Sequence, residues 1–215
     1  MAGESYHDAP WEAVPEGLDP PHLELRRTFL LQRVAAAAPR EGPPPRVLDL
    51  GCGEGRFTAE LARAGATAVG VDVSHEALRR ARARYPELDL RTIPPHGSWP
   101  LGDAGFDIVW AGETIEHVAD TTGWLSEVRR VLRPGGTLLL STPAHGRIAL
   151  LLLALSPRRF ARHFDPRSDH LRFYSARTLS LLLEDCRFED IEVRAAGGPP
   201  GMRPLLLARA RRARY

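Results

Sequence analysis

Apolar and polar positions along this chain alternate in blocks that predict short buried strands separated by amphipathic helices. Ser74 and Ser175 stand directly ahead of two helical patterns, where N-cap residues are expected. The pattern predicts strands at 46–51, 67–73, 88–93, 106–111, 136–142, 188–194 and roughly 204–209, and helices at 23–38, 55–64, 75–85, 121–133 and 176–185. Elements in this order require a parallel sheet with right-handed crossovers, so the predicted fold class is α/β, with a doubly wound, mostly parallel sheet.

Three segments do not fit this alternation. Residues 1–22 are acidic and rich in proline, and we interpret them as an irregular arm. An insert at 143–174 separates the fifth strand from the last helix, and a turn at 197–201 joins the last two strands. We therefore divide the chain into an N-terminal arm and helix, 1–45, and a binding domain, 46–215, which form one structural domain overall.

Three glycines follow the first strand at alternate positions, Gly51, Gly53 and Gly55. Glycine at such a turn permits a positive φ angle and leaves the backbone bare enough for a ligand to lie against it. Asp72 ends the second strand about 20 residues further on, where a carboxylate can accept hydrogen bonds from ribose hydroxyls. These two signals together predict a cofactor that contains a nucleoside.

The spacing of the glycines distinguishes between cofactors. In the dinucleotide fingerprint G-x-G-x-x-G, the third glycine lies where a helix N-terminus faces a pyrophosphate. Here Gly55 comes one residue early, position 56 is arginine, and Asp49 precedes the turn. A carboxylate repels a pyrophosphate but attracts an ammonium or a sulfonium group. The segment from Asp49 to Gly55, with Asp72, resembles motif I and the following acidic motif of class I S-adenosylmethionine-dependent methyltransferases.

Three further segments agree with this resemblance. Residues 99–109 are similar to the family's stretch before the fourth strand, Glu113 to Val118 resemble its E-x-x-E-H-V, and Val131 to Thr137 match its VL-x-PGG turn. Four motifs in order are far more specific than one glycine-rich turn. The resemblance covers residues 46–194 and implies a Rossmann-like sheet of seven strands with an antiparallel C-terminal hairpin.

The resemblance implies that S-adenosyl-L-methionine is the cofactor and S-adenosyl-L-homocysteine its product. In the family the strand-end acid holds the ribose, the glycine-rich turn holds the amino-acid moiety, and the residue after the acid packs on adenine. Many relatives carry an acid after the third strand for the adenine amino group, whereas this chain has His96 in a proline-rich loop. The candidate cofactor-binding residues are Asp49, Gly51, Cys52, Gly53, Gly55, Asp72, Val73, His96 and Gly112.

Methyl transfer to a hydroxyl requires alignment with the sulfonium carbon and removal of the acceptor's proton. His117 follows the fourth strand and is the best-placed base; the competing interpretation is that Glu116 and His117 cap a helix and orient their loop. Glu113, Glu116, His117 and His170 also resemble the divalent-metal site of ubiquinone-pathway O-methyltransferases and small-RNA 2′-O-methyltransferases. Since Glu-His at this point also occurs in relatives without a metal, these four residues are catalytic candidates and a divalent cation stays open.

The insert carries an apolar run, Ile148 to Leu155, followed by four arginines and a histidine between positions 158 and 167. One interpretation is a buried lid helix with a solvated basic flank. The other is an apolar acceptor site or a contact with a membrane surface, with an anionic group nearby, as for a lipid-linked acceptor. By resemblance, Tyr6, Trp11 and Arg27 would close over the cofactor; the alternative is that the two aromatic side chains are ordinary surface residues.

Composition narrows the class of partner. The net charge of +2 gives no general argument for nucleic acid, and the two cysteines, Cys52 and Cys186, make no disulfide framework or metal pair. No secretory signal is visible and the longest apolar run is too short to span a bilayer, so we expect a cytoplasmic protein without a transmembrane segment. All basic residues other than histidine are arginine and asparagine is absent, as in GC-rich bacterial genomes.

We therefore predict an enzyme, an S-adenosylmethionine-dependent methyltransferase (EC 2.1.1) that methylates a small molecule, at a hydroxyl oxygen. Two alternatives stay open. An RNA 2′-O-methyltransferase should show a larger basic surface, and a non-catalytic protein could bind the same cofactor without turnover. The sequence does not indicate the identity of the acceptor or the oligomeric state.

Overall fold

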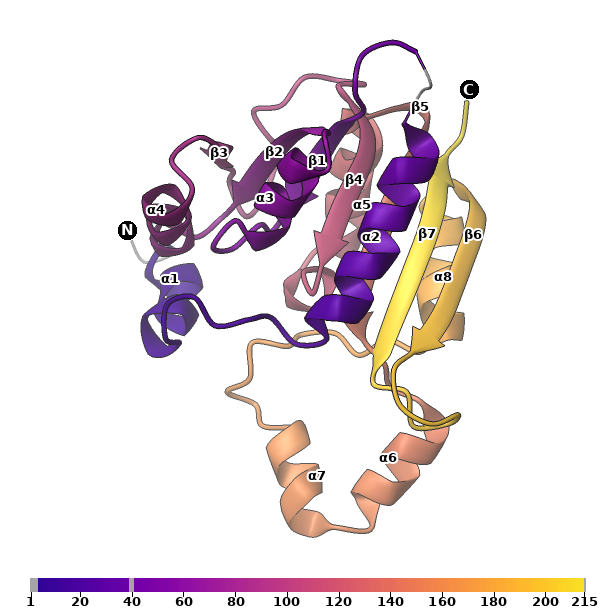
Figure 1. The fold of residues 1–215 in the computed structure, drawn as a ribbon. Coiled ribbons are helices and arrows are strands. Elements are labelled where there is room, and N and C mark those ends of the chain that lie inside the picture. The colour runs from indigo at the N-terminus through magenta and orange to yellow at the C-terminus, as the bar shows by residue number, and fades with distance from the viewer. Residues whose placement is uncertain (1–3, 39–40, 215) are drawn as a thin grey trace.

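A seven-stranded sheet forms the centre of the computed structural model, which describes residues 4–38 and 41–214 and, of residues 4–6, the backbone only (Figure 1). The strand order is β3-β2-β1-β4-β5-β7-β6, with β1 to β5 parallel and β7 antiparallel to both β5 and β6. The predicted fold class and C-terminal hairpin are confirmed. The strands are β1 (Arg46–Leu50), β2 (Thr67–Asp72), β3 (Asp89–Thr92), β4 (Phe106–Gly112), β5 (Leu132–Pro143), β6 (Phe188–Ala196) and β7 (Leu205–Arg212).

Helices cover both faces of the sheet. The helices α2 (Leu23–Ala37) and α3 (Arg56–Arg63) pack on one face, and α5 (Thr121–Val131) and α8 (Ala176–Asp185) pack on the other. Because side chains alternate along a strand, β1 contributes Val47 to the first core and Leu48 to the second. A smaller cluster joins α4 (His75–Arg84) to β3.

The predicted helix starts are confirmed by capping contacts. The Ser74 hydroxyl accepts a hydrogen bond from the backbone N–H of Ala77 at the start of α4. Ser175 accepts one from Thr178 and forms a capping box at the start of α8. Each contact satisfies a backbone donor that the helix itself leaves unpaired.

The description of residues 1–22 as an irregular arm was wrong. Residues Glu4–Ala13 form a helix, α1, which packs against α4. Pro10 lies inside it and its apolar residues make no helical stripe, so periodicity gave no signal. Long-range polar contacts, described below, hold this helix in place.

The insert contains two helices, α6 (Arg147–Ala154) and α7 (Pro157–His163), which project as a pair away from the sheet (Figure 1). Neither helix has a buried residue. The interpretation of the apolar run as a buried lid helix is therefore wrong. Among the described residues, no helix combines the length and apolar character needed to cross a bilayer.

Candidate functional site

The carboxyl ends of β1, β2 and β4 meet at one edge of the sheet. β1 lies between β2 and β4, and the helices that follow β1 and β4 pack on opposite faces. Such a switch point leaves a crevice outside the strand ends, where ligands of doubly wound sheets bind. The Thr114 hydroxyl donates a hydrogen bond of 3.1 Å to the Leu50 carbonyl and ties the loop after β4 to the end of β1.

Backbone geometry requires glycine at two positions of the turn after β1. Gly51 and Gly53 have φ angles of 75° and 52°, in the left-handed region. A Cβ atom on Gly51 would lie 2.6 Å from the Thr114 hydroxyl, and one on Gly53 would lie 2.6 Å from the Trp11 ring. The turn therefore cannot accept a side chain at either place without a shift of its neighbours.

The other two residues predicted in the turn have different surroundings. Cys52 is buried and its side chain joins the cluster between α4 and β3, where burial raises the pKa of the thiol well above its usual range. Only its backbone is left to face a ligand. Gly55, with a left-handed φ of 78°, is the N-cap residue of α3.

Asp72 is buried at the end of β2 and braces the glycine turn. One carboxylate oxygen accepts a hydrogen bond of 2.8 Å from the Gly53 N–H, and the other accepts one of 2.9 Å from the Ser74 N–H. Burial raises the pKa of this carboxyl. Each of these oxygens can accept one further hydrogen bond. The next residue, Val73, is half-buried and packs against the second core, on the α5 and α8 face of the sheet.

Asp49 and Arg26 are two buried ionisable groups that influence each other electrostatically. Asp49 is 2% exposed and accepts a hydrogen bond of 2.6 Å from the Thr58 hydroxyl. Burial raises the pKa of Asp49 to about 7, although the Thr58 bond and Arg26 both lower it. Arg26 comes from α2, is 3% exposed, and its Nε has no hydrogen-bond partner among the described residues. The site thus places a buried guanidinium and a buried carboxyl group near the glycine turn.

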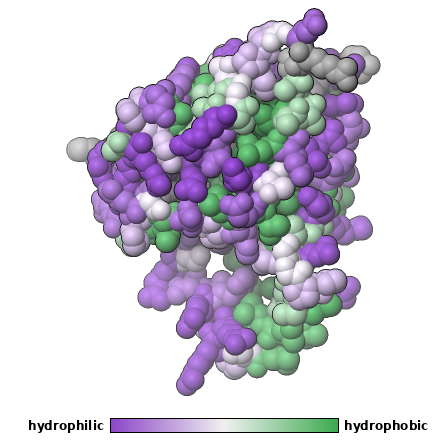
Figure 2. Space-filling model, in the orientation of Figure 1, coloured by the Kyte–Doolittle hydropathy of each residue, from purple (hydrophilic) through white to green (hydrophobic). Residues whose placement is uncertain are grey.

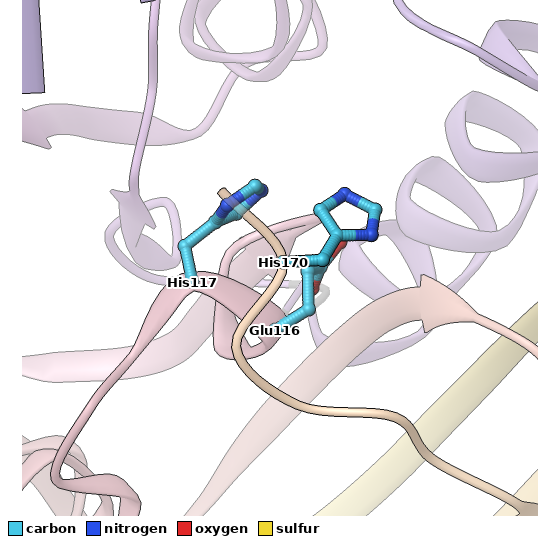
Figure 3. A group of neighbouring side chains, drawn as sticks. All are labelled: Glu116, His117 and His170. Carbon is cyan, nitrogen blue, oxygen red and sulfur yellow. The ribbon is translucent and has the colours of Figure 1, made fainter. Parts of the chain in front are cut away.

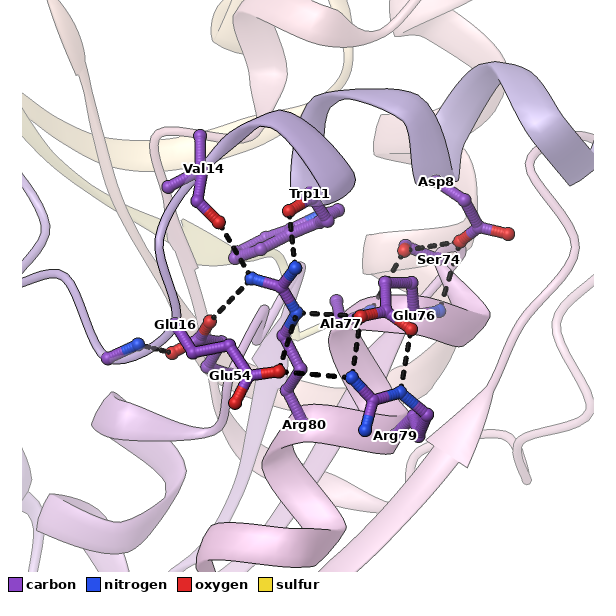
Figure 4. Close-up of polar contacts among 11 residues, drawn as sticks. Asp8, Trp11, Val14, Glu16, Glu54, Ser74, Glu76, Ala77, Arg79 and Arg80 are labelled. Carbon is purple, nitrogen blue, oxygen red and sulfur yellow. Dashed lines mark hydrogen bonds and ion pairs between the residues drawn. The ribbon is translucent and has the colours of Figure 1, made fainter.

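The helix α1 lies over the glycine turn, held by Arg80 of α4 (Figure 4). The Arg80 guanidinium donates hydrogen bonds to the backbone carbonyls of Trp11 (2.6 Å) and Val14 (2.9 Å) and pairs with Glu76 at 2.7 Å. Asp8 accepts hydrogen bonds from the Ser74 hydroxyl and the Glu76 N–H. The Trp11 ring therefore rests against the backbone of the turn.

A carboxylate and two imidazoles converge beside the crevice (Figure 3). Glu116, His117 and His170 each offer a ligand atom within 4.8 Å of the others. His117 Nδ1 lies 3.1 Å from the Asp169 carbonyl oxygen and 3.4 Å from its carboxylate. The rings of His117 and His170 meet edge to face at 4.9 Å.

The two glutamates predicted with these histidines differ in position. Glu116 is 1% exposed; one oxygen accepts a hydrogen bond from the Thr142 hydroxyl, and the other has no partner among the described residues. Burial, with the nearby charge of Glu113, raises the pKa of Glu116 to about 8. Glu113 instead accepts a hydrogen bond from the Ser141 hydroxyl and is not part of the converging group. Of the four residues predicted to lie together, Glu116, His117 and His170 converge and Glu113 does not.

The last two predicted cofactor-binding residues, Gly112 and His96, have different surroundings. A Cβ atom on Gly112 would lie 2.5 Å from the Arg26 guanidinium, so this glycine admits Arg26 to the crevice. His96 is exposed in the loop after β3 and makes no polar or ring contact within the described part of the chain. Its assignment to the adenine stays a prediction.

The two neighbouring arginines of α2 have different surroundings. Arg27, predicted to close over the cofactor, pairs with Glu60 on α3 at 3.0 Å. Its neighbour Arg26 is the buried one, and it shares a helix face with Leu30 and Val34, which was the available signal. Trp11 does cover the turn, whereas the Tyr6 side chain lies outside the described residues.

Comparisons with known proteins agree with this geometry. The family described as "Methyltransferase domain" matches residues 22–193. A probable S-adenosylmethionine-dependent methyltransferase of Mycolicibacterium smegmatis is 37% identical over 146 residues, which are 66% of this chain and 51% of that protein. The chain thus spans about half the length of this relative. A ubiquinone biosynthesis O-methyltransferase of Dinoroseobacter shibae is 30% identical over 80% of this chain and 75% of its own length.

Solved structures share the fold. The phosphoethanolamine N-methyltransferase 2 of Haemonchus contortus, in complex with S-adenosyl-L-methionine, superposes with a TM-score of 0.67 at 17% identity and covers 99% of this chain and 57% of that one. At this identity the likeness shows the fold alone. The family match over most of the chain, the strand order and the glycine-rich turn together place this chain in the methyltransferase domain family of class I S-adenosylmethionine-dependent methyltransferases.

Proposed function

We propose that this protein transfers the methyl group of S-adenosyl-L-methionine to a hydroxyl oxygen of a small-molecule acceptor. One observation carries the proposal: His117, whose Nδ1 faces the Asp169 carbonyl, stands at the same sheet edge as the glycine turn and Asp72. An oxygen acceptor is supported by the relative named as a ubiquinone biosynthesis O-methyltransferase.

The residues of the crevice match the chemical groups of the cofactor. Asp72 would accept hydrogen bonds from the ribose hydroxyls, the backbone of 51–55 would lie against the amino-acid moiety, and Val73 would pack on adenine. Arg26 offers a cation to the cofactor's carboxylate and Asp49 an anion to its ammonium group. When bound, S-adenosyl-L-methionine supplies a methyl group on positively charged sulfur.

His117 would take the acceptor's proton. A backbone carbonyl can only accept, so the Nδ1 atom facing the Asp169 carbonyl carries the ring's proton, and Nε2 is the basic nitrogen. A carboxylate oxygen of Asp169 also lies 3.4 Å from Nδ1. A base positioned in this way contributes a rate factor of about 10²–10⁴.

A divalent cation is an alternative use of the same side chains. The unpartnered oxygen of Glu116 and the rings of His117 and His170 fit a cation that accepts both oxygen and nitrogen ligands. A cation held there would lower the pKa of a bound hydroxyl. Because Nδ1 of His117 is engaged with Asp169, its Nε2 can serve as ligand or as base, not both. Full activity in a chelator, with no metal in the purified protein, would select the base.

Labelled methyl transfer tests the proposal. The protein is incubated with methyl-labelled cofactor and fractionated extract of its source organism, beside the His117→Gln variant. We expect a labelled small-molecule ether or ester with the natural protein and little with the variant. Label in RNA would favour an RNA methyltransferase. Cofactor binding without any labelled product would favour a non-catalytic protein and contradict the proposal.

A further inference from the structure

A row of apolar side chains on α6 faces solvent. Ile148, Leu151, Leu152 and Leu155 follow the spacing i, i+3, i+4, i+7, so they share one side of the helix. They are 53%, 64%, 45% and 74% exposed. Figure 2 shows the α6 side of the projecting pair as a continuous hydrophobic area. Soluble proteins rarely leave contiguous side chains of this size uncovered unless they bind something.

Other exposed apolar residues extend this α6 row. Met202, 49% exposed, lies in the turn between β6 and β7, and the adjacent Gly201 approaches Ile148 so closely that a Cβ atom would lie 2.7 Å from it. Phe160 on α7 and Phe164 directly after this helix are 46% and 38% exposed, with ring centroids 4.7 Å apart. Exposed apolar residues therefore occur on or directly after both helices and in the neighbouring turn.

The same segment concentrates positive charge. Residues 146–173 contain six arginines and two aspartates, a net formal charge of +4, whereas the whole chain carries +2. Arg158, Arg159 and Arg162 on α7 are exposed and have no ion-pair partner among the described residues. In Figure 2 hydrophilic residues stand directly beside the hydrophobic area of the projecting pair.

We propose that the α6–α7 pair docks onto an anionic membrane surface, with the α6 row among the acyl chains and the arginines on lipid phosphates. Helices that lie in a membrane interface combine an apolar side with basic residues in this way. Arginine stems can lie along the apolar region while their guanidinium groups stay at the headgroups. A second copy of the chain is a poorer occupant, because each copy would bring a charge of +4 to the same interface.

The docking surface connects directly to the candidate site. The chain returning from α7 donates hydrogen bonds from the N–H groups of Leu171 (2.8 Å) and Arg172 (3.1 Å) to the Glu116 carbonyl. Asp169, which faces His117, belongs to the same stretch. Docking would hold the candidate site close to the membrane; that consequence rests on the proposed function, whereas docking itself does not.

Co-sedimentation with vesicles tests the docking. Vesicles of phosphatidylcholine alone are compared with vesicles that also contain phosphatidylglycerol. We expect binding to the anionic vesicles that weakens at high salt, since screening shortens the reach of the charges. The variant Arg158→Gln, Arg159→Gln, Arg162→Gln should bind anionic vesicles on the order of 100-fold more weakly, at about fivefold per arginine. The control Arg177→Gln removes an exposed arginine of α8 and should bind as the natural protein does.

The apolar contribution is tested separately. The variant Leu151→Glu, Leu155→Glu should bind at least ~10-fold more weakly, while Leu181→Glu, at a 44% exposed leucine of α8, should leave binding unchanged. Unchanged thermal unfolding and cofactor binding establish that each variant is folded. Absence of binding to either vesicle, or equal binding by the double variant and the natural protein, would overturn the proposal. So would a dimer in sedimentation velocity that the double variant dissociates, because the α6 row would then join two copies.

Discussion

Two helical additions to the sheet, α1 and the α6–α7 pair, differ in what holds them. α1 has little apolar surface, yet it rests on the glycine turn because Arg80, Asp8 and Glu76 connect it to α4. α6 is apolar at every position after Arg147, yet none of its residues is buried. Burial therefore depends on a complementary partner as much as on hydrophobicity. The first addition has its partner within the chain, at the glycine turn and α4, whereas the second leaves its apolar surface uncovered.

The largest expected effect is a loss of turnover without a loss of cofactor binding. His117→Gln should lower kcat by about 10²–10⁴, because the base is lost, with the cofactor Kd unchanged. Steady-state kinetics and calorimetry measure the two quantities independently. If cofactor affinity falls together with kcat, His117 contributes to cofactor binding and its assignment as the base is wrong.

Asp72→Ala is the corresponding change at a residue proposed to bind the cofactor. Loss of charged hydrogen bonds to the ribose should raise the cofactor Kd on the order of 100-fold. Thermal unfolding reports on folding, since the variant also leaves the Gly53 and Ser74 N–H groups without their acceptor. A folded variant with unchanged Kd would refute the ribose assignment.

The attachment of α1 is tested by a matched pair of arginines. Arg80→Gln removes the donors to the Trp11 and Val14 carbonyls, so α1 should detach more often and cofactor should dissociate roughly 10-fold faster. The control is Arg79→Gln, since Arg79 pairs with Glu76 and Glu16 but donates to neither carbonyl. Stopped-flow dissociation compares the two. Equal rates would show that α1 does not retain the cofactor.

The smallest expected effect is a dependence of cofactor affinity on pH. Because burial raises the pKa of Asp49 to about 7, its carboxylate becomes ionised only as the pH rises through that value. Affinity for the cationic cofactor should therefore rise by at most about tenfold between pH 6 and 8. Over the same interval Asp49 should lower the free energy of unfolding of the ligand-free protein, because in the unfolded chain it ionises at lower pH. An Asp49→Asn variant with the same pH dependence would contradict this.

The elements set by local pattern could be predicted from the sequence. Strand periodicity, the glycines of the turn and the serine N-caps depend on neighbouring residues, and they agree with the structure to within a few residues. β5 differs most: it begins at Leu132, because Leu132 pairs with Phe106 ahead of an irregularity in the ladder. Propensity does not report such pairing between distant segments.

The contacts that join distant segments could not be predicted. Nothing near Trp11 in the sequence indicates that Arg80, 69 residues later, binds its carbonyl. The choice between Arg26 and Arg27 depends on the rotation of α2 about its axis, which the positions of Leu30 and Val34 determine. Glu113 lies three residues before Glu116, but its left-handed φ of 56° and its bond to Ser141 direct it away from the converging group.

Isothermal titration of the folded protein with S-adenosyl-L-methionine tests the central claim most directly, with S-adenosyl-L-homocysteine as a second ligand and NAD⁺ as the control. We predict one site that binds both sulfur compounds and gives no heat with NAD⁺, because Asp49 and the early Gly55 suit a cation and not a pyrophosphate. Heat with NAD⁺ alone, or with none of the three, would contradict the account.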